Sequence, residues 1–345
     1  MKRCQKSTRS WRIAMKSIYR HATRMFASSL AALILLTGCA TTNTATNIAE
    51  QPGPAASPAA ITLLTPKAPS LIPAVYMEKT EADGTFQIAK WDSIEQLLAG
   101  IQGNEAPLYA APINVGANLY AKGMPIQLLH VNTYGSMYLI SLDPNVRELS
   151  QLSNETVYIP GQSGPPDILT QHLLAKKGLQ GKVNLAYGVI PDIMQQLAAG
   201  TIKHAVLPEP VLSGFRMKTK GKVSEVVDFQ KEWQAEFGQD LPQTAVFVNR
   251  DWAKTHAADI ARFEQSYQEA VRQVNQQAGE TLKIAAEEFG MPEAVLASAL
   301  PKITLLYKDA QTAKPEVERY LGVLLQIAPD SIGGSVPDAD FYYGS

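Results

Sequence analysis

The amino-acid sequence predicts an α/β fold, because short apolar runs alternate with segments of helical periodicity between residues 61 and 249. Alternation of this kind is typical of βαβ units, so we expect largely parallel sheets. The expected strands are ITLL (61–64), PLYAA (107–111), IQLLHV (126–131), MYLIS (137–141), TVYIP (156–160), VNLAYG (183–188), HAVLP (204–208) and TAVFVN (244–249), and the expected helices between them are 92–100, 165–177 and 191–199.

The last hundred residues are predicted to be mostly helical. Between residues 251 and 277, apolar residues recur at spacings of three and four, which marks one buried helix face. That face consists of Ile260, Phe263, Tyr267, Ala270, Val271 and Val274.

A weak internal repeat is the third observation on the fold. The segments 94–112 and 193–208 both give a helix, a glycine, a short strand and a proline, with Gly100 and Gly200 as the expected helix C-caps. The similarity is either a chance match or the sign of two similar α/β lobes. In two lobes the loops after these strands would face a cleft, because ligands bind beyond the carboxyl ends of strands. Those loops are 112–116 and 208–213.

The amino terminus predicts export. Eight basic residues and no acidic one occur before residue 25, and an apolar stretch from Met25 to Leu36 follows. This order is that of a secretory signal, and the stretch is shorter than the roughly 20 residues needed to span a bilayer. It ends in Leu36-Thr-Gly-Cys39, which resembles the bacterial lipobox. We expect residues 1–38 to be a signal peptide, whether translation begins at Met1 or Met15, and Cys39 to be acylated.

Residues 39–60 are predicted to form a flexible tether, because they contain almost no large apolar side chain. The folded part is expected to begin at Ile61. The only other cysteine, Cys4, lies in the leader, so the exported chain has no pair for an internal disulfide.

Composition argues against nucleic acid as a partner. Removing the eight basic residues of the leader from the 31 in the chain leaves 23 against 32 acidic residues, a net charge of about −9. Nucleic-acid binding requires a basic face that displaces counterions from phosphates, and no run of lysine or arginine offers one.

The sequence gives no support for a reactive centre. The histidines of the exported chain, which are His130, His172, His204 and His256, are far apart and form no metal-binding or triad spacing. We therefore expect no cofactor, no metal and no catalytic residue.

The segment 158–167 closes a strand and opens a helix. Ser163 or Gly164 can cap that helix, and Pro165 and Pro166 suit its first turn. Free amides at the helix start would favour an anion or a carbonyl in the cleft. A capped helix without a ligand is the equally weighted alternative.

Two other loops are candidates for contact with a ligand. Glu209 lies between two prolines at a strand end, where it either contacts a ligand or, as we prefer, braces the loop between lobes. The glycine of Tyr134-Gly135-Ser136 would allow close approach of the backbone to a ligand, and a simple turn is the alternative.

Taken together, these stretches resemble the substrate-binding lipoproteins of ABC importers, in the group of nitrate, sulfonate, taurine and thiamine-pyrimidine binders. The residues that carry the resemblance are the lipobox and the segments 97–123, 159–179, 196–213 and 332–343. The resemblance implies a two-lobe fold of the periplasmic-binding-protein type II class, with a hinge and a central cleft. The implied crossings are near 138–154 and 240–246, with lobe I at 61–140 and 245–345 and lobe II at 141–244.

The resemblance also implies the ligand-contacting loops. No arginine suited to a sulfonate or nitrate occurs in them, and the helix-start amides with Asn114, Tyr134 and Tyr187 would suit a neutral or aromatic metabolite. The full set of expected ligand-binding residues is Ser70, Leu71, Asn114, Tyr134, Gly135, Ser136, Gln162, Ser163, Gly164, Tyr187 and Glu209.

The function implied is capture of a small solute by hinge closure and its delivery to the permease and ATPase subunits of an ABC importer. We expect a monomer, exported and anchored through lipid to the outer face of a membrane. The alternatives are an enzyme of related fold, such as those that synthesise pyrimidines, and a lipoprotein that senses a ligand.

Overall fold

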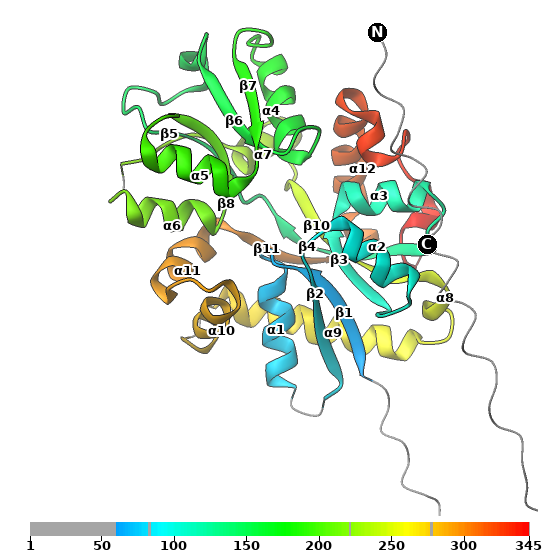
Figure 1. Cartoon of the computed structure of the whole chain (residues 1–345). Coiled ribbons are helices and arrows are strands. Elements are labelled where there is room, and N and C mark those ends of the chain that lie inside the picture. Colours follow the sequence, from blue (N-terminus) through cyan, green and yellow to red (C-terminus); the bar gives the residue numbers. More distant parts are fainter. Residues whose placement is uncertain (1–59, 82–83, 221, 277–278, 345) are drawn as a thin grey trace, which may run out of the picture. The chain divides into compact units, whose positions relative to one another are not determined.

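Two mixed β-sheets with helices packed around them form the described part of the chain (Figure 1). The structure is a computed structural model that describes residues 60–344 apart from 82–83, 221 and 277–278. The predicted signal peptide, most of the tether and Cys39 lie outside the described residues.

The first sheet has six strands. β1 pairs in parallel with β2 and β3, whereas β10 lies antiparallel between β3 and β4, and β11 lies antiparallel to β4. In spatial order the strands are β11 (Thr304–Asp309), β4 (Ile126–Tyr134), β10 (Pro242–Asn249), β3 (Leu108–Pro112), β1 (Ile61–Pro66) and β2 (Phe86–Trp91).

The second sheet has five strands. β6 pairs in parallel with β7 and β8, whereas β5 lies antiparallel between β8 and β9. In spatial order they are β7 (Asn184–Gly188), β6 (Thr156–Pro160), β8 (His204–Pro208), β5 (Met137–Ser141) and β9 (Ser224–Asp228).

The predicted α/β class is confirmed, but the expectation of largely parallel sheets is wrong. Each sheet contains a strand that runs against its neighbours, β10 in the first and β5 in the second. Each of these two strands follows a connection between the sheets. It therefore enters its sheet on the side where the parallel strands end, and runs in the opposite direction to them. The alternation of strands and helices does not reveal that reversal.

The internal repeat is a repeat of topology. The order β2-β1-β3-β10-β4 in the first sheet matches β7-β6-β8-β5-β9 in the second, with the same parallel and antiparallel pairs. Three helices follow the equivalent strands in each half. They are α1 (Leu71–Thr80), α2 (Ile94–Gln102) and α3 (Ile113–Ala121), and α4 (Pro165–Lys176), α5 (Ile190–Ala199) and α6 (Val211–Lys218).

The two glycines of the repeat have different roles. Gly200 caps α5 in the left-handed conformation, as expected, with φ of 71°. Gly100 is not a C-cap, because α2 continues to Gln102 and ends at Gly103. A β-carbon at Gly100 would lie 2.5 Å from Leu64 Cδ2, so glycine at this position allows α2 to pack closely on β1.

The chain passes between the sheets twice. β4 ends at Tyr134 in the first sheet and β5 begins at Met137 in the second. Residues 137–140, which the expected boundary at 140 assigned to lobe I, therefore pair in the second sheet. The chain returns between α7 (Phe229–Phe237) and β10. The division into lobes remains a prediction.

The remaining helices follow β10. They are α8 (Arg250–Ala253), α9 (Ala257–Asn275), α10 (Gly279–Phe289), α11 (Glu293–Ala299) and α12 (Ala310–Ile327). All six apolar residues predicted for the inner face of α9 are buried, which confirms the helical periodicity. None of the described helices is long and apolar enough to cross a bilayer.

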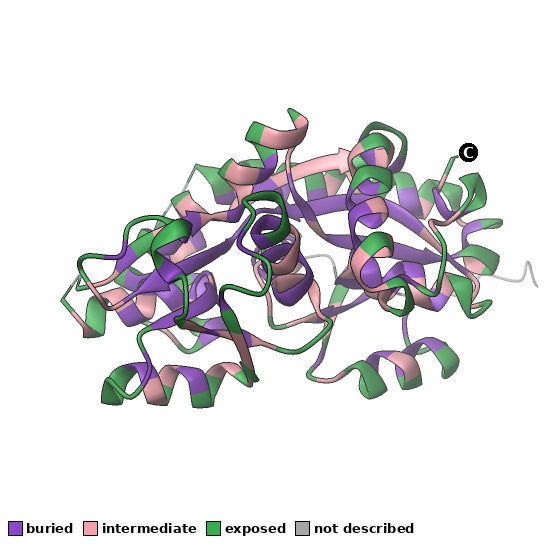
Figure 2. Cartoon of the chain, turned by 90° about the horizontal axis from the view of Figure 1, so that it is seen from above, coloured by how far each residue is buried: buried purple, intermediate pink, exposed green. Residues whose placement is uncertain are grey.

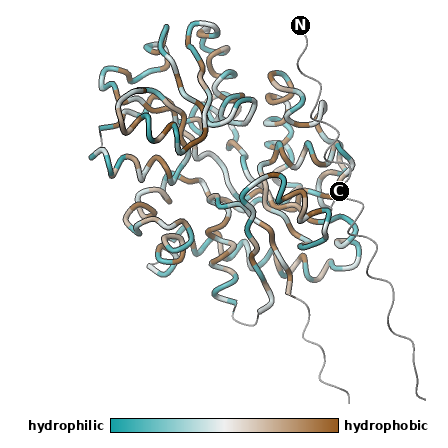
Figure 3. The backbone as a smooth tube through the Cα atoms, viewed as in Figure 1, coloured by the Kyte–Doolittle hydropathy of each residue, from teal (hydrophilic) through white to brown (hydrophobic). Residues whose placement is uncertain are grey.

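The cores follow from these faces. One apolar cluster contains Val131 of β4, Leu139 of β5 and Val157 of β6, and thus extends across both sheets. A second joins the first sheet to α9, which runs beneath β1 and β2 in Figure 1. Many strand residues are buried (Figure 2), and Figure 3 shows the hydropathy of each residue along the same chain.

Candidate ligand-binding site

The carboxyl ends of the parallel strands in the two sheets meet at the crossing from β4 to β5. Tyr134 pairs with Pro242 and Pro112 with Thr244, so β3 and β4 end at the same edge of the first sheet. Met137 pairs with Pro208, so β8 ends where β5 begins. The three residue steps from Tyr134 to Met137 span at most about 11 Å. The two edges where α/β proteins bind ligands are therefore adjacent.

Ser70 and Leu71 follow the end of β1 in the first half. Ser70 is the N-cap residue of α1 and is fully buried, and its Oγ has no hydrogen-bond partner among the described residues. Its carbonyl oxygen accepts a hydrogen bond of 2.9 Å from the Tyr267 hydroxyl, which accepts one of 3.0 Å from Asn132 Nδ2. Leu71 is buried in the core.

Asn114 lies in the first turn of α3, next to the end of β3. It is 8% exposed, and its Oδ1 has no partner within the part of the chain that the structure describes. The N-cap of α3 is Pro112, whose side chain cannot accept a hydrogen bond from the helix amides. Because β1 and β3 are neighbours, Ser70 and Asn114 occupy adjacent helix starts.

Tyr134, Gly135 and Ser136 form the crossing itself. The amide of Gly135 donates to the Leu241 carbonyl at 3.0 Å, and Ser136 Oγ donates to Gln243 Oε1 at 3.0 Å, so these bonds join the two connections between the sheets. A β-carbon at Gly135 would lie 2.3 Å from Gln230 Cβ. The close approach that requires glycine here is therefore to α7.

Tyr134 is fully buried, and its hydroxyl has no partner among residues 60–344 that the structure describes. Burial, followed by the Glu316 carboxylate, raises the pKa of this hydroxyl above its ordinary value. The Lys308 ammonium lies 4.8 Å from the ring centre. Tyr134 is thus a neutral hydroxyl within the crossing.

Gln162, Ser163 and Gly164 form the loop before α4, with Gly164 as N-cap and Ser163 at φ of 59°. This helix start offers fewer free amides than the sequence suggested. Pro165 and Pro166 have no amide hydrogen, and the Ser163 amide donates to Asp167 Oδ2 at 2.8 Å.

Asp167 is the residue that the sequence reasoning missed. It is 1% exposed, and its Oδ1 accepts hydrogen bonds from Gln171 Nε2 at 2.8 Å and from the Tyr187 hydroxyl at 3.0 Å. Burial and, after it, this carboxylate raise the pKa of Tyr187 to about 12. An acidic residue three positions after the N-cap is a capping signal that could have identified Asp167.

Glu209 is buried at the end of β8. Its carboxylate accepts hydrogen bonds of 3.0 Å from both the amide and the hydroxyl of Ser213, and Lys302 Nζ lies 3.9 Å from its Oε1. Burial raises the pKa of Glu209, although the Ser213 bonds and Lys302 oppose this. Lys302 also accepts a bond of 3.0 Å from the Tyr138 hydroxyl at its carbonyl. These contacts favour the bracing role.

The expected site residues thus form three groups. Ser70, Leu71 and Asn114 lie at the edge of the first sheet, whereas Gln162, Ser163, Gly164 and Tyr187 gather around Asp167 at the edge of the second. The third group lies at the crossing, where the Glu209 amide donates to the Ser136 carbonyl at 2.8 Å. It consists of Tyr134, Gly135, Ser136 and Glu209.

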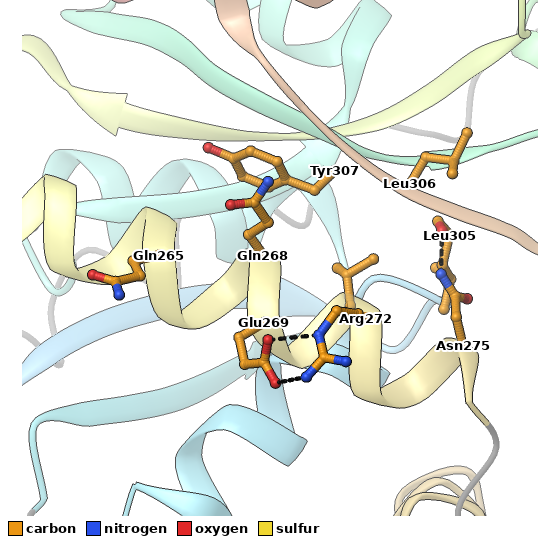
Figure 4. Close-up of a pocket in the computed structure, with 9 residues that line it drawn as sticks. Gln265, Gln268, Glu269, Arg272, Asn275, Leu305, Leu306 and Tyr307 are labelled. Atoms are coloured by element: carbon orange, nitrogen blue, oxygen red, sulfur yellow. Dashed lines mark hydrogen bonds and ion pairs between the residues drawn. The ribbon is translucent and has the colours of Figure 1, made fainter.

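Two pockets differ in whether they contain residues of these groups. The larger, of about 670 Å³, lies between α9 and β11, where the exposed Glu269 and Arg272 pair and Asn275 donates to the Leu305 carbonyl (Figure 4). It contains no expected site residue. The other, of about 470 Å³, is lined by Gly135 at the crossing and by Asp240 and Lys302.

The strand order and the paired carboxyl edges define a two-lobe binding-protein fold. A family model described as menaquinone biosynthesis matches residues 131–313, which is more than half of the chain, and the chain therefore belongs to this family. A comparison with curated proteins found no match.

Solved structures confirm the resemblance to binding proteins of ABC importers. An ABC transporter protein from Parabacteroides distasonis is 25% identical, covers 82% of this chain and 98% of its own, and has a TM-score of 0.72. The aliphatic sulphonate binding protein SsuA from Escherichia coli is 16% identical, with coverage of 83% and 96% and a TM-score of 0.64. SsuA from Xanthomonas axonopodis pv. citri, bound to MOPS, is 17% identical, with coverage of 82% and 96% and a TM-score of 0.59.

Proposed function

We propose that the protein is an extracytoplasmic solute-binding lipoprotein of an ABC transporter, which captures a small organic solute by hinge closure and delivers it to a permease. The observation that carries this proposal is the meeting of two equivalent carboxyl edges at the short crossing from Tyr134 to Met137. Similarity over most of the chain to an ABC transporter protein supports it.

The contacts at the crossing suggest how closure would work. The hinge consists of residues 134–137 and the return between α7 and β10, which the Gly135 and Ser136 bonds hold together. Lys302 contacts Glu209 and Ser213 of the second half from the short turn Leu300–Lys302 of the first. Rotation about the hinge would change the spacing of the two edges while this brace limits its range.

The proposed binding residues are the three groups described above, and Cys39 with the tether 39–60 would hold the binding domain near the membrane. The site would orient the solute with hydroxyls, amides and tyrosine rings. No bond in the solute needs to form or break.

Thermal stability in the presence of solutes tests the proposal. The full chain, purified in detergent, is heated with each member of a panel of vitamins, pyrimidines, amino acids, sulfonates and oxyanions. A solute present at 100 times its Kd stabilises the fold by about 2.7 kcal/mol, which gives a clear rise in Tm. Failure of every solute to raise Tm would refute a solute-binding role.

A matched pair of variants locates the binding. Tyr187→Phe removes the hydroxyl bonded to Asp167 and is expected to weaken the effect of the solute. Tyr158→Phe, on the adjacent strand β6, is the control and should leave it unchanged. Equal effects of the two variants would contradict the placement at the second edge.

An enzyme of the same fold is the second candidate, because the matching family model is described as menaquinone biosynthesis. The two functions differ in the fate of the solute. Each solute that raises Tm, together with menaquinone precursors, is incubated with the protein and measured by mass spectrometry. A binding protein returns the solute unchanged, whereas conversion beyond one equivalent would establish the enzyme.

A further inference from the structure

One strand of the first sheet lies outside the repeat of the two halves. The order β2-β1-β3-β10-β4 has its equivalent in the second sheet, whereas β11, at the edge beside β4, has no counterpart among the described strands of that sheet. The register of β11 against β4 shifts between Leu305 and Lys308. Bulges in a strand re-aim side chains and are frequent near functional sites. The side chain that follows this shift is Lys308.

Lys308 binds two carboxylates. Its Nζ donates to Asp240 Oδ2 at 3.0 Å and to Glu316 Oε1 of α12 at 2.6 Å. The three side chains are at most 22% exposed. Hydrogen bonds between charged groups are stronger than neutral ones, and salt screens partly buried pairs less than exposed pairs. Lys308 is therefore a firm attachment point on the first half.

Asp240 divides its two carboxylate oxygens between the halves. It lies in the return connection between α7 and β10. Its Oδ2 accepts from Lys308 of the first half, whereas its Oδ1 accepts bonds of 2.8 Å from the Nε2 atoms of Gln230 and Gln234, both on α7 of the second half. Gln230 Oε1 in turn accepts from the Leu241 amide at 2.9 Å. Rotation about the return connection therefore changes the geometry on at least one side of this carboxylate.

The same lysine lies beside the other connection. Its Nζ is 4.8 Å from the centre of the Tyr134 ring, at the end of β4 where the first crossing begins. The Gly135 amide of that crossing donates to the Leu241 carbonyl of the return at 3.0 Å. Both connections of the hinge are thus held around Lys308 and Asp240.

The pKa directions agree with an ionised pair. Although burial acts to raise the pKa of Asp240, hydrogen bonds from Lys308 and Gln234 hold it below its ordinary value. Although burial acts to lower the pKa of Lys308, its hydrogen bonds to Glu316 and Asp240 raise it. Both groups therefore carry their charges at neutral pH.

We propose that Asp240 and Lys308 are the positioning residues of the hinge, which set the angle between the two halves, an inference that rests on the hinge closure proposed above. A neutral residue at either position releases the return connection from the first half and widens the range of angles. A smaller fraction of the molecules then has the angle that binds the solute, so the apparent affinity falls.

Distances between spin labels on the ligand-free full chain measure this angle. The labels are attached through Ile94→Cys and Val189→Cys, at exposed positions where α2 and α5 begin in equivalent places of the two halves. Both native cysteines, Cys4 and Cys39, are replaced with serine. The neutral variants at the hinge should widen the distribution of label distances at least about twofold.

The first neutral variant is Lys308→Met, which removes both ion pairs. The second is Asp240→Asn, whose amide oxygen still accepts from Gln230 and Gln234 while its nitrogen cannot accept from Lys308. Asp240→Asn keeps the test decisive if Lys308→Met does not fold. An unchanged distribution in the folded variants would overturn the inference.

Two further variants separate the hinge charge from other effects. Lys176→Met removes an ion pair of 2.8 Å to Glu236 within the second half, and it should leave the distribution unchanged. Lys308→Arg keeps the charge and the donors, and it should restore the width of the wild type. Equal widening in Lys176→Met, or a Lys308→Arg variant as wide as Lys308→Met, would show that the hinge pair does not set the angle.

Solute affinity separates the two proposals. The apparent affinity for any solute that raises Tm should fall about tenfold in Lys308→Met and stay the same in Lys176→Met. Unchanged affinity despite a wider distribution would overturn the positioning role while solute binding stands. If no solute raises Tm, the proposed function fails, and the label distances still decide whether the pair sets the angle.

Discussion

Replacing Asp167 with alanine should destabilise the protein more than an ordinary surface substitution does. The change removes the acceptor of three hydrogen bonds, from the Ser163 amide, Gln171 Nε2 and the Tyr187 hydroxyl. Loss of a helix-start bond costs about 1 kcal/mol, with a range of roughly 0.5–2. The other two donors are half-exposed or exposed and regain water, so each adds about 0.5–1 kcal/mol. The expected loss is about 2–4 kcal/mol.

Urea unfolding followed by circular dichroism measures this loss. For a domain of this size, 1 kcal/mol lowers Tm by about 2–4 °C, so a fall of about 4–16 °C should accompany it. Asp167→Asn is the control, because its amide keeps the shape and can still accept from Ser163 and donate to Tyr187. We expect Asp167→Asn to retain at least half of the stability that the alanine variant loses. A loss of less than about 0.5 kcal/mol in the alanine variant, with an unchanged m-value, would refute the capping argument.

Three other outcomes are expected. Burial raises the pKa of Glu209, so the stability that this group contributes to the folded protein is complete below its ordinary pKa of 4.5 and is lost as pH rises through the raised pKa. The free energy of unfolding of Glu209→Gln should therefore increase relative to that of the wild type across that pH window, by at most about 1.4 kcal/mol per pH unit. Parallel curves of stability against pH for the two proteins would contradict this. Gly116→Ala would place a β-carbon 2.0 Å from Phe247 Cζ and should cost about 1–3 kcal/mol, whereas the control Gly322→Ala, with nothing within 4 Å, should stabilise by about 0.5–1 kcal/mol; calorimetry that shows equal effects would disprove the packing argument. Cys39→Ser should abolish acylation in a mass spectrum of the exported protein and release it from membranes, and a lipid-bearing serine variant would rule out this anchor.

The strand pattern identified most of the sheet elements from sequence. MYLIS, TVYIP and HAVLP are strands at the predicted residues, and the apolar face of α9 is buried as its spacing indicated. Local periodicity suffices for these, because side-chain burial in one element repeats every two or 3.6 residues.

The candidate site was predictable only in part. The glycine and proline residues marked the loops after strands, but they did not show that Asp167 fills the start of α4 or that Gly135 approaches Gln230. The Asp167 contact is local and leaves a capping signal in the sequence, whereas the Gly135 contact depends on a side chain of α7, a separate element. Glu209 illustrates the same limit, since its proline neighbours indicate a rigid loop and only the fold supplies Lys302 as its partner.

The sequence by itself determined the α/β class and the positions of most strands, and it gave the first sign of a repeat, because these follow from local hydrophobic spacing. The tertiary structure decided which strands run antiparallel, which edges adjoin and which helix starts are filled. Those features depend on where the chain crosses between sheets at residues 134–137, and so short a crossing leaves no periodic signal. The helix starts are neutral in the first half and acidic in the second. This difference is recognised only when equivalent strands of the two sheets are matched by their topology.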